Sequence, residues 1–127
     1  MTHTHARVIV PWPPSGLSPN GSQGDYRGKA RLASAYKARC ALLMMEKGRA
    51  VKRLPPGSVV QRVIVVACPP PKVSRYDFDN LARRLKPAFD ALAAALGVDD
   101  GDWRVMVLER GERCKAGAVI VVVEVVG

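Results

Sequence analysis

A nearly continuous run of β-branched residues between Val59 and Ala67 is the feature that most constrains the fold. The run reads VVQRVIVVA and is closed shortly afterwards by three consecutive prolines, 69–71. β-Branched residues favour strands, and a strand that is apolar at almost every position is typically covered on both faces. Proline cannot donate a hydrogen bond to a neighbouring strand, so the prolines end the segment. We therefore expect a strand buried inside a sheet.

Three further strands and two helices are expected around this strand. Strands are predicted at Arg7–Val10, at Trp103 to Glu109 and at Ala118 to Val126, the last two forming a hairpin through residues 111–115. The apolar periodicity predicts helices from Gly28 to about Gly48 and from about Asp79 to Leu96. Gly97 suits the C-terminal cap of the second helix, and Pro87 should kink that helix. Residues 1–6 are expected to be a disordered tail.

The expected order is β-α-β-α-β-β, without repeats or linkers. This order predicts an α+β fold: one small domain over residues 1–127, with a mixed sheet of about four strands and two helices. The longest apolar stretch, Ala116 to Val123, is far shorter than the ~20 residues of a membrane-spanning helix. Residues 1–6 show no charged region followed by an apolar one, as a secretory signal would. We expect a cytoplasmic protein that does not enter a membrane.

The charge of the chain points to a polyanionic partner. The formal net charge is +9 and the isoelectric point is about 10.0, and a basic surface gains affinity for nucleic acid by releasing counterions from the phosphates. Nine bases and a single acid, Glu46, lie in the segment 27–53; the bases are Arg27, Lys29, Arg31, Lys37, Arg39, Lys47, Arg49, Lys52 and Arg53. By contrast, six of the eleven acids lie between Asp77 and Asp102, and all six are aspartates. Such a cluster of like charges is stabilised when cations bind between them.

The aspartates follow a spacing that can bring carboxylates together. If residues 76–79 are extended, Asp77 and Asp79 point to the same side, although Asp79 also suits an ordinary helix N-cap. At about 100° per residue, Lys86 falls on the same helix face as Asp79. An antiparallel return of the next strand would bring Asp99 and Asp100 close to the first pair, although these residues also suit a plain acidic turn.

Three such carboxylates, without histidine or cysteine, are ligands for Mg²⁺ or Mn²⁺. An ion of this kind activates water and neutralises a leaving oxyanion, and a nearby lysine adds positive charge to the transition state.

Three stretches of the chain resemble the RusA family of Holliday-junction resolvases of bacteria and their phages. They are Trp12-Pro13-Pro14-Ser15 with Leu17-Ser18-Pro19-Asn20, then Asp77-Phe78-Asp79-Asn80-Leu81, and then Lys86-Pro87-Ala88-Phe89-Asp90-Ala91-Leu92 leading to Gly97-Val98-Asp99-Asp100. The resemblance implies an α+β fold, a homodimer, Mg²⁺ dependence and paired nicks across a four-way DNA junction.

The resemblance also implies roles for single residues. Asp77, Asp79 and Asp100 would be the metal-binding acids, with Asp99 as the second choice for the third, and Lys86 would be the catalytic lysine. Some family members have a shorter spacing between the DxDN element and the lysine, which leaves Arg83 as a rival for this role. The DNA-contacting bases predicted from the charge pattern are Arg27, Lys29, Arg31, Lys37, Arg75, Arg83 and Arg84, although each also suits a solvated surface.

The leading hypothesis is a Mg²⁺-dependent endonuclease that cuts branched DNA, with Mn²⁺ as a substitute metal. Two alternatives remain open. One is a non-enzymatic basic module that binds DNA or RNA, in which the aspartates only cap and turn the chain. The other is a metal-dependent phosphohydrolase that acts on a small phosphate ester.

Overall fold

The valine-rich run forms β2 (Val59–Cys68), an interior strand of a four-stranded mixed sheet in the order β1-β4-β2-β3. The computed structural model describes residues 1–17, 26–48 and 50–127. β2 pairs in parallel with β3 (Val105–Arg110) and antiparallel with β4 (Ala118–Val126), which pairs antiparallel with β1 (Thr2–Pro11). The expectation of a strand buried within a sheet is confirmed, because the side chains of Val60, Val63 and Val65 are fully buried.

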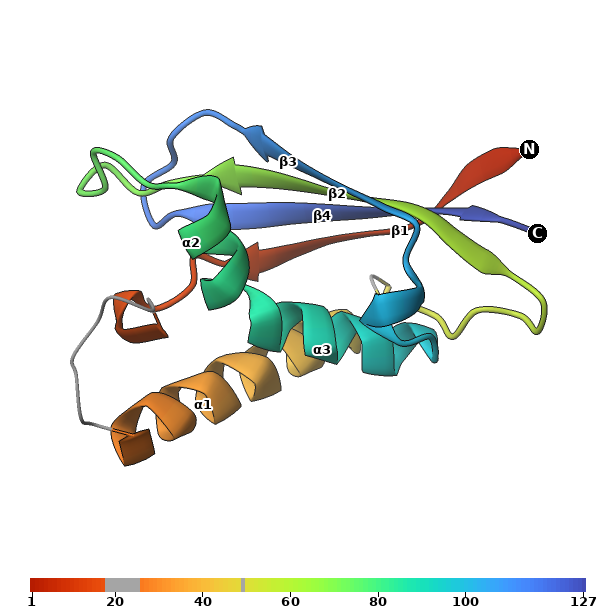
Figure 1. Cartoon of the computed structure of the whole chain (residues 1–127), viewed down its shortest axis with the longest axis horizontal. Helices are drawn as coiled ribbons and strands as arrows, with labels where there is room; N and C mark the ends of the chain where they lie inside the picture. Colours follow the sequence, from red (N-terminus) through yellow and green to blue (C-terminus); the bar gives the residue numbers. More distant parts are fainter. Residues whose placement is uncertain (18–25, 49) are drawn as a thin grey trace.

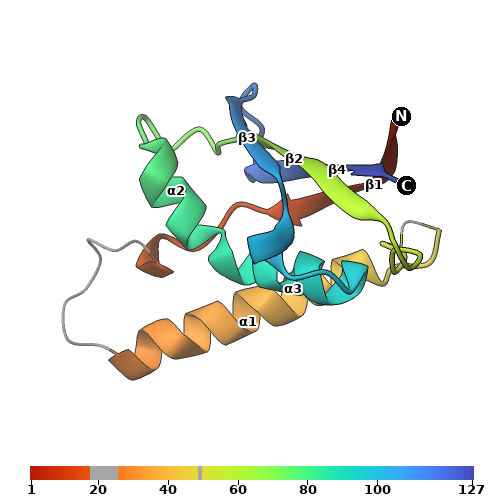
Figure 2. The same ribbon diagram turned by 45° about the vertical axis from the view of Figure 1, so that its right-hand side comes forward.

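Three α-helices accompany the sheet in the described part of the chain and lie on one side of it, as Figures 1 and 2 both show. α1 (Tyr26–Met44) packs along α3 (Lys86–Leu96), and alternate side chains of the strands are buried on the side facing these helices. The Tyr36 hydroxyl of α1 donates a 2.6 Å hydrogen bond to the Pro11 carbonyl at the end of β1. Burial raises the pKa of this hydroxyl, which therefore stays protonated and keeps α1 attached to β1. The molecule is a small α+β domain, as predicted.

The predicted hairpin of the last two strands is wrong. β2 lies between β3 and β4, and the two helices α2 and α3 connect β2 to its parallel neighbour β3. The loop after β3 bonds to the end of β2 instead of folding back on β3: the Gly111 amide donates to the Ala67 carbonyl at 2.7 Å, and the Cys114 amide donates to the Pro69 carbonyl at 3.2 Å. The loop thereby crosses the end of β2 and leads the chain into β4, on the other side of β2 from β3.

The prediction of a disordered N-terminal tail is also wrong. β1 begins at Thr2, and His3 lies opposite Val125 of β4, with a register shift between Thr4 and Ala6. His5 Nε2 lies 2.7 Å from the Lys52 carbonyl oxygen. The polar residues of this segment carry no apolar periodicity, so its strand structure comes from pairing with β4.

The second predicted helix is divided into α2 (Phe78–Arg84) and α3, which run in different directions (Figure 1). Pro87 lies in the first turn of α3, where its missing N–H is tolerated, and its ring prevents a straight continuation from α2. α3 ends as predicted, with Gly97 in the left-handed conformation at φ 76° and its amide bonded to the Ala93 carbonyl. The break thus agrees with the kink expected from Pro87.

Two short 3₁₀ turns complete the described elements, η1 (Ser15–Leu17) and η2 (Asp100–Asp102). α1 begins and ends two to four residues before the positions predicted for it. Ser18, Pro19 and Asn20 of the proline-rich motif and Arg49 of the basic segment lie outside the described residues. Among the helices that the structure describes, none is long and apolar enough to cross a membrane.

Candidate functional site

Asp77 and Asp79 stand at the beginning of α2 with exposed carboxylates. Asp77 takes the N-cap position, with an extended backbone at φ −92° and ψ 144°, and its carbonyl accepts a 2.9 Å bond from the Leu81 amide. Its side chain makes no capping hydrogen bond, and Asp79 lies inside the first turn. The prediction of Asp79 as the N-cap is therefore wrong, and so is that of an extended 76–79 segment, because the helix starts at Phe78. No base in the described ranges lies within ion-pair distance of either carboxylate.

Arg110, at the end of β3, holds the segment that carries these two aspartates. Both of its terminal nitrogens lie 3.4 Å from the Tyr76 carbonyl oxygen, to which they donate. Its guanidinium carbon lies 4.6 Å from the centre of the Tyr76 ring and 4.2 Å from that of the Phe78 ring. A guanidinium over an aromatic face is attracted by the ring electrons. Because Tyr76 and Phe78 flank Asp77 in the chain, Arg110 determines where Asp77 lies relative to the sheet.

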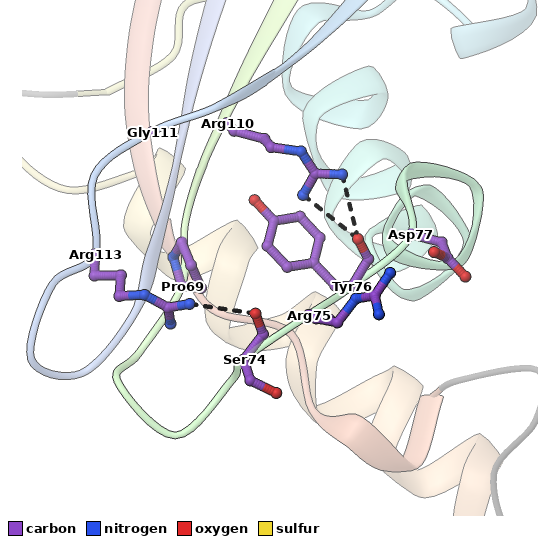
Figure 3. A pocket seen from close by; sticks show the side chains of 8 residues that line it. All are labelled: Pro69, Ser74, Arg75, Tyr76, Asp77, Arg110, Gly111 and Arg113. Atoms are coloured by element: carbon purple, nitrogen blue, oxygen red, sulfur yellow. Dashed lines mark hydrogen bonds between the residues drawn. The ribbon is translucent and has the colours of Figure 1, made fainter.

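Asp77 opens onto a hollow of about 390 Å³ that we call the arginine hollow. Its lining residues come from the segment after β2, from the end of β3 and from the loop that follows β3; they are Pro69, Ser74, Arg75, Tyr76, Asp77, Arg110, Gly111 and Arg113 (Figure 3). Arg113 is held by backbone carbonyls, donating to Val73, to Pro70 at 3.1 Å and to Ser74 at 3.4 Å. Arg75 is exposed and forms no hydrogen bond or ion pair with any residue of the described ranges. The hollow therefore has three positive groups against one carboxylate.

Lys86 forms the second group of charges. At the start of α3, its Nζ lies 3.0 Å from the Asp90 carboxylate and also donates to the Asp100 carboxylate in η2. The hydrogen bonds to Asp100 and Asp90 raise the pKa of Lys86, and the bond from Lys86 lowers the pKa of Asp100. The structure thus brings together a predicted lysine and a predicted acid that are 14 residues apart, both charged at neutral pH.

Asp99, the second choice for the third acid, stabilises the turn that carries Asp100. Its Oδ1 accepts a 3.1 Å hydrogen bond from the Gly101 amide at the beginning of η2. The Asp99 side chain thus acts as the cap of a short 3₁₀ turn, which matches the plain acidic-turn interpretation for this one residue.

The predicted cluster of three carboxylates does not form among the described residues, where no three His, Cys, Asp or Glu side chains lie close enough to hold a metal ion together. The parallel pairing of β3 is the reason. Asp77 follows β2 and packs near the end of β3 through Arg110, whereas Asp100 precedes β3. Met106, beside Lys86, and Arg110 are four strand residues apart, about 13 Å along β3. The two charged groups therefore occupy different parts of one edge of the sheet.

The predicted DNA-contacting bases differ in their exposure. Arg27, Arg31, Lys37, Arg75 and Arg83 are exposed, and Lys29 is partly buried. Arg83 and Lys86 border the same shallow hollow as Phe89 and Met106, so the predicted catalytic lysine and its rival are neighbours.

Arg84 differs from the other predicted DNA-contacting bases in its burial. It is buried, donates to the Pro13 carbonyl at 2.5 Å and to the Pro14 carbonyl at 3.2 Å, and lies 5.9 Å from the centre of the Trp12 ring. The residue ties α2 to the Trp12-Pro13-Pro14 motif, and its role as a DNA contact stays a prediction.

Sequence reasoning placed Asp90 on the same charged helix face as Lys86 without making it a site residue, and it did not single out Arg110 or Arg113. Asp90 carried a signal, since it lies four residues after Lys86 on one helix, a spacing at which opposite charges meet. Arg110 and Arg113 carried no such signal in the sequence, because the order of the strands determines which residues lie next to them.

Comparisons with known proteins were made on the whole chain. A scan against models of protein families found no match, and a search of curated proteins found none either. The similarity to the RusA family therefore stays a prediction from short motifs, and the functional argument depends on the geometry described above.

Proposed function

We propose that this chain is a Mg²⁺-dependent, RusA-like endonuclease that cuts branched DNA, such as a four-way junction, and acts as a homodimer. One observation carries the proposal. Asp77 and Asp79 leave two exposed, unpaired carboxylates at the start of α2, and Asp77 borders a hollow lined by three arginines. Carboxylates beside positive charge, on a chain of net charge +9, suit a site that holds both a metal ion and a phosphate backbone.

The carboxylates at α2 fit Mg²⁺ in the manner usual for enzymes that act on phosphates. Mg²⁺ is commonly held by one or two carboxylates, several waters and oxygens of the substrate phosphate, so a third carboxylate is not needed. Asp77 and Asp79 would hold the ion, and Mn²⁺ would serve as a substitute. The ion would supply Lewis-acid polarisation of the phosphoryl oxygen. Arg110 keeps these two carboxylates in place by holding the Tyr76 carbonyl and packing on Phe78.

Lys86 would supply a fixed positive charge to the same DNA strand, from its place farther along the edge of the sheet. Its raised pKa keeps the amine protonated at neutral pH, which favours electrostatic stabilisation of negative charge over a role as general base. Asp100 and Asp90 hold the ammonium group from two sides. In this proposal Asp100 acts through Lys86, and Asp99 acts by holding the turn that carries Asp100.

Cleavage of a synthetic four-way junction tests the proposal. We expect the protein to cut the junction in preference to a linear duplex of the same sequence, and only when Mg²⁺ or Mn²⁺ is present. Asp79→Asn removes a metal-binding carboxylate while keeping the size of the side chain, so cleavage should fall at least about 100-fold with junction binding retained. The matched control is Glu46→Gln, which changes an exposed acid in the turn after α1. This variant should cut the junction as the unchanged protein does.

The runner-up is a basic module that binds branched nucleic acid without cutting it. The observation in its favour is that the three predicted carboxylates do not gather in the described part of the chain. Tight junction binding without cleavage in Mg²⁺ or Mn²⁺ would establish this alternative. Cleavage that survives Asp79→Asn would instead refute the assignment of the site to α2, and turnover of free nucleotides without DNA cleavage would indicate a small-molecule phosphohydrolase.

A further inference from the structure

We propose that the arginine hollow binds one phosphodiester group of the DNA strand, adjacent to the phosphate held at Asp77 and Asp79. The inference builds on the proposed function and assigns the recognition of the flanking strand to three residues. These are Arg75, Arg110 and Arg113, of which only Arg75 was predicted from sequence.

The charge balance of the hollow supports an anionic ligand. Its lining has three guanidinium groups and one carboxylate, and in the described ranges no acid lies within 4 Å of any of the three arginines. The acceptors that Arg110 and Arg113 do have are backbone carbonyls, which orient a guanidinium without neutralising it. An excess of positive charge in a concave site attracts anions, and arginine pairs with phosphate oxygens through two parallel hydrogen bonds.

Two of the three arginines are held in position before any ligand arrives. Arg110 is fixed by the Tyr76 carbonyl and by two aromatic rings, and Arg113 is fixed by the carbonyls of the loop that follows β2. Groups that are already ordered lose little entropy on binding, so their contacts contribute more to affinity. Arg75 has no such partner in the described ranges and can turn toward the ligand.

The position of Asp77 indicates which phosphate the hollow would hold. Asp77 lies at one side of the hollow and Arg113 at the other in Figure 3, with Arg75 and Arg110 between them in this view. A carboxylate repels a phosphate unless a cation lies between the two, so the phosphate at Asp77 must be the one that shares the metal ion. A second phosphate of the same strand, nearer the arginines, needs no metal. The volume of about 390 Å³ lies within the range of small-ligand sites and accommodates a phosphate with part of its nucleotide.

Junction binding without divalent metal tests this assignment separately from cleavage. Arg75→Gln should weaken binding about tenfold and lower the slope of log affinity against log salt by about one, because one phosphate contact is lost. Lys47→Gln also removes one positive charge, from an exposed position in the turn after α1 that lies outside both the hollow and the uncovered face of the sheet. This control should bind as the unchanged protein does.

Neutral methylphosphonates, which replace single phosphates of the DNA near the branch point of the four-way junction, would locate the phosphate that the arginine hollow binds. At one position in the DNA, the methylphosphonate should weaken binding by the unchanged protein. The same methylphosphonate should not weaken binding by the Arg75→Gln variant any further, because the variant has already lost that contact. Additive losses at every position, or an Arg75→Gln variant that binds like Lys47→Gln, would refute the hollow as a phosphate site.

The two proposals fail in different ways. Cleavage of the junction together with unchanged binding by Arg75→Gln would overturn the phosphate site and leave the nuclease standing. Loss of binding by Arg75→Gln in a protein that never cuts DNA would support the phosphate site and refute the nuclease.

Discussion

The contact between Lys86 and Asp100 shifts the pKa values of both side chains. Each is partly exposed, with 55% of the Lys86 side chain and 24% of the Asp100 side chain accessible, so solvent screens their attraction. Their pKa values nevertheless move in the directions expected for an ion pair, upward for Lys86 and downward for Asp100, because each stabilises the charged form of the other. The carboxylate side of this pair gives a test by pH.

Asp100→Asn should lower the free energy of unfolding at neutral pH by up to about 1 kcal/mol, the range of an exposed ion pair. The pKa of Asp100 in the folded protein lies below its ordinary value of 3.8. The contribution is therefore complete above about pH 4 and is lost as the pH falls through the lowered pKa. Urea unfolding at a series of pH values from 7 to 3 should show the two proteins converging in acid.

Asp102→Asn, in the same 3₁₀ turn, serves as the control and should stay within about 0.5 kcal/mol of the unchanged protein at each pH. A deficit of Asp100→Asn that persists undiminished at the acid end would contradict the ion-pair explanation.

At the scale of elements, α2 is the helix on which the proposed site depends. It has seven residues, too few to be stable alone, and it is tied to the rest of the molecule at both ends. Arg110 holds the segment before it, and Arg84 in its last turn holds the Pro13 and Pro14 carbonyls. The Trp12-Pro13-Pro14 motif, used above only as a mark of resemblance, therefore has a structural role: it receives the end of α2.

Arg84→Met should destabilise the protein by about 2–4 kcal/mol, because it leaves two partly buried carbonyl groups without donors. Arg83→Met, one residue earlier on the exposed side of α2, should change the free energy of unfolding by less than about 0.5 kcal/mol. Thermal and urea unfolding of the two variants give the comparison. A stable Arg84→Met protein with weakened DNA binding would support the role in DNA contact that the sequence suggested.

For the whole molecule, the uncovered face of the sheet is the main feature not used by the candidate site. The helices described lie on the other face, and this one carries apolar side chains next to one another across β1, β4 and β2. Ile9 is 47% exposed, and its neighbours Ile120, Val122, Ile64 and Val66 are partly buried. Contiguous exposed apolar surface on a small protein is typical of an interface. The homodimer in our proposed function requires a self-complementary surface, and we assign it to this face.

Ile9→Glu should therefore convert the proposed dimer to a monomer, since it places a charge within the apolar contact without a partner. Sedimentation velocity over a range of protein concentrations would measure the change. The matched control is Leu42→Glu on α1, which is also exposed, at 69%, and should leave the dimer intact. A dimer that resists Ile9→Glu but dissociates with Leu42→Glu would move the interface to α1.

Local rules accounted for much of the architecture. The central strand, the last strand, the end of α3 at Gly97 and the break near Pro87 follow from β-branched composition, from the freedom of glycine at positive φ and from the geometry of proline. Each depends on a residue and its immediate neighbours in the chain. The net charge and the position of the aspartates on the α2 and η2 segments are likewise properties of the sequence.

The order of the strands was decided by tertiary structure alone. A hairpin between β3 and β4 was the nearest pairing in sequence, but the observed order places both valine-rich strands, β2 and β4, in the interior of the sheet. The same pairing made His3 part of a strand and placed Arg110 against Tyr76. It also separated Asp100 from Asp77 and brought it to Lys86. Composition and spacing determined which charged groups this protein has, whereas long-range strand pairing, driven by burial of apolar surface, decided which of them meet.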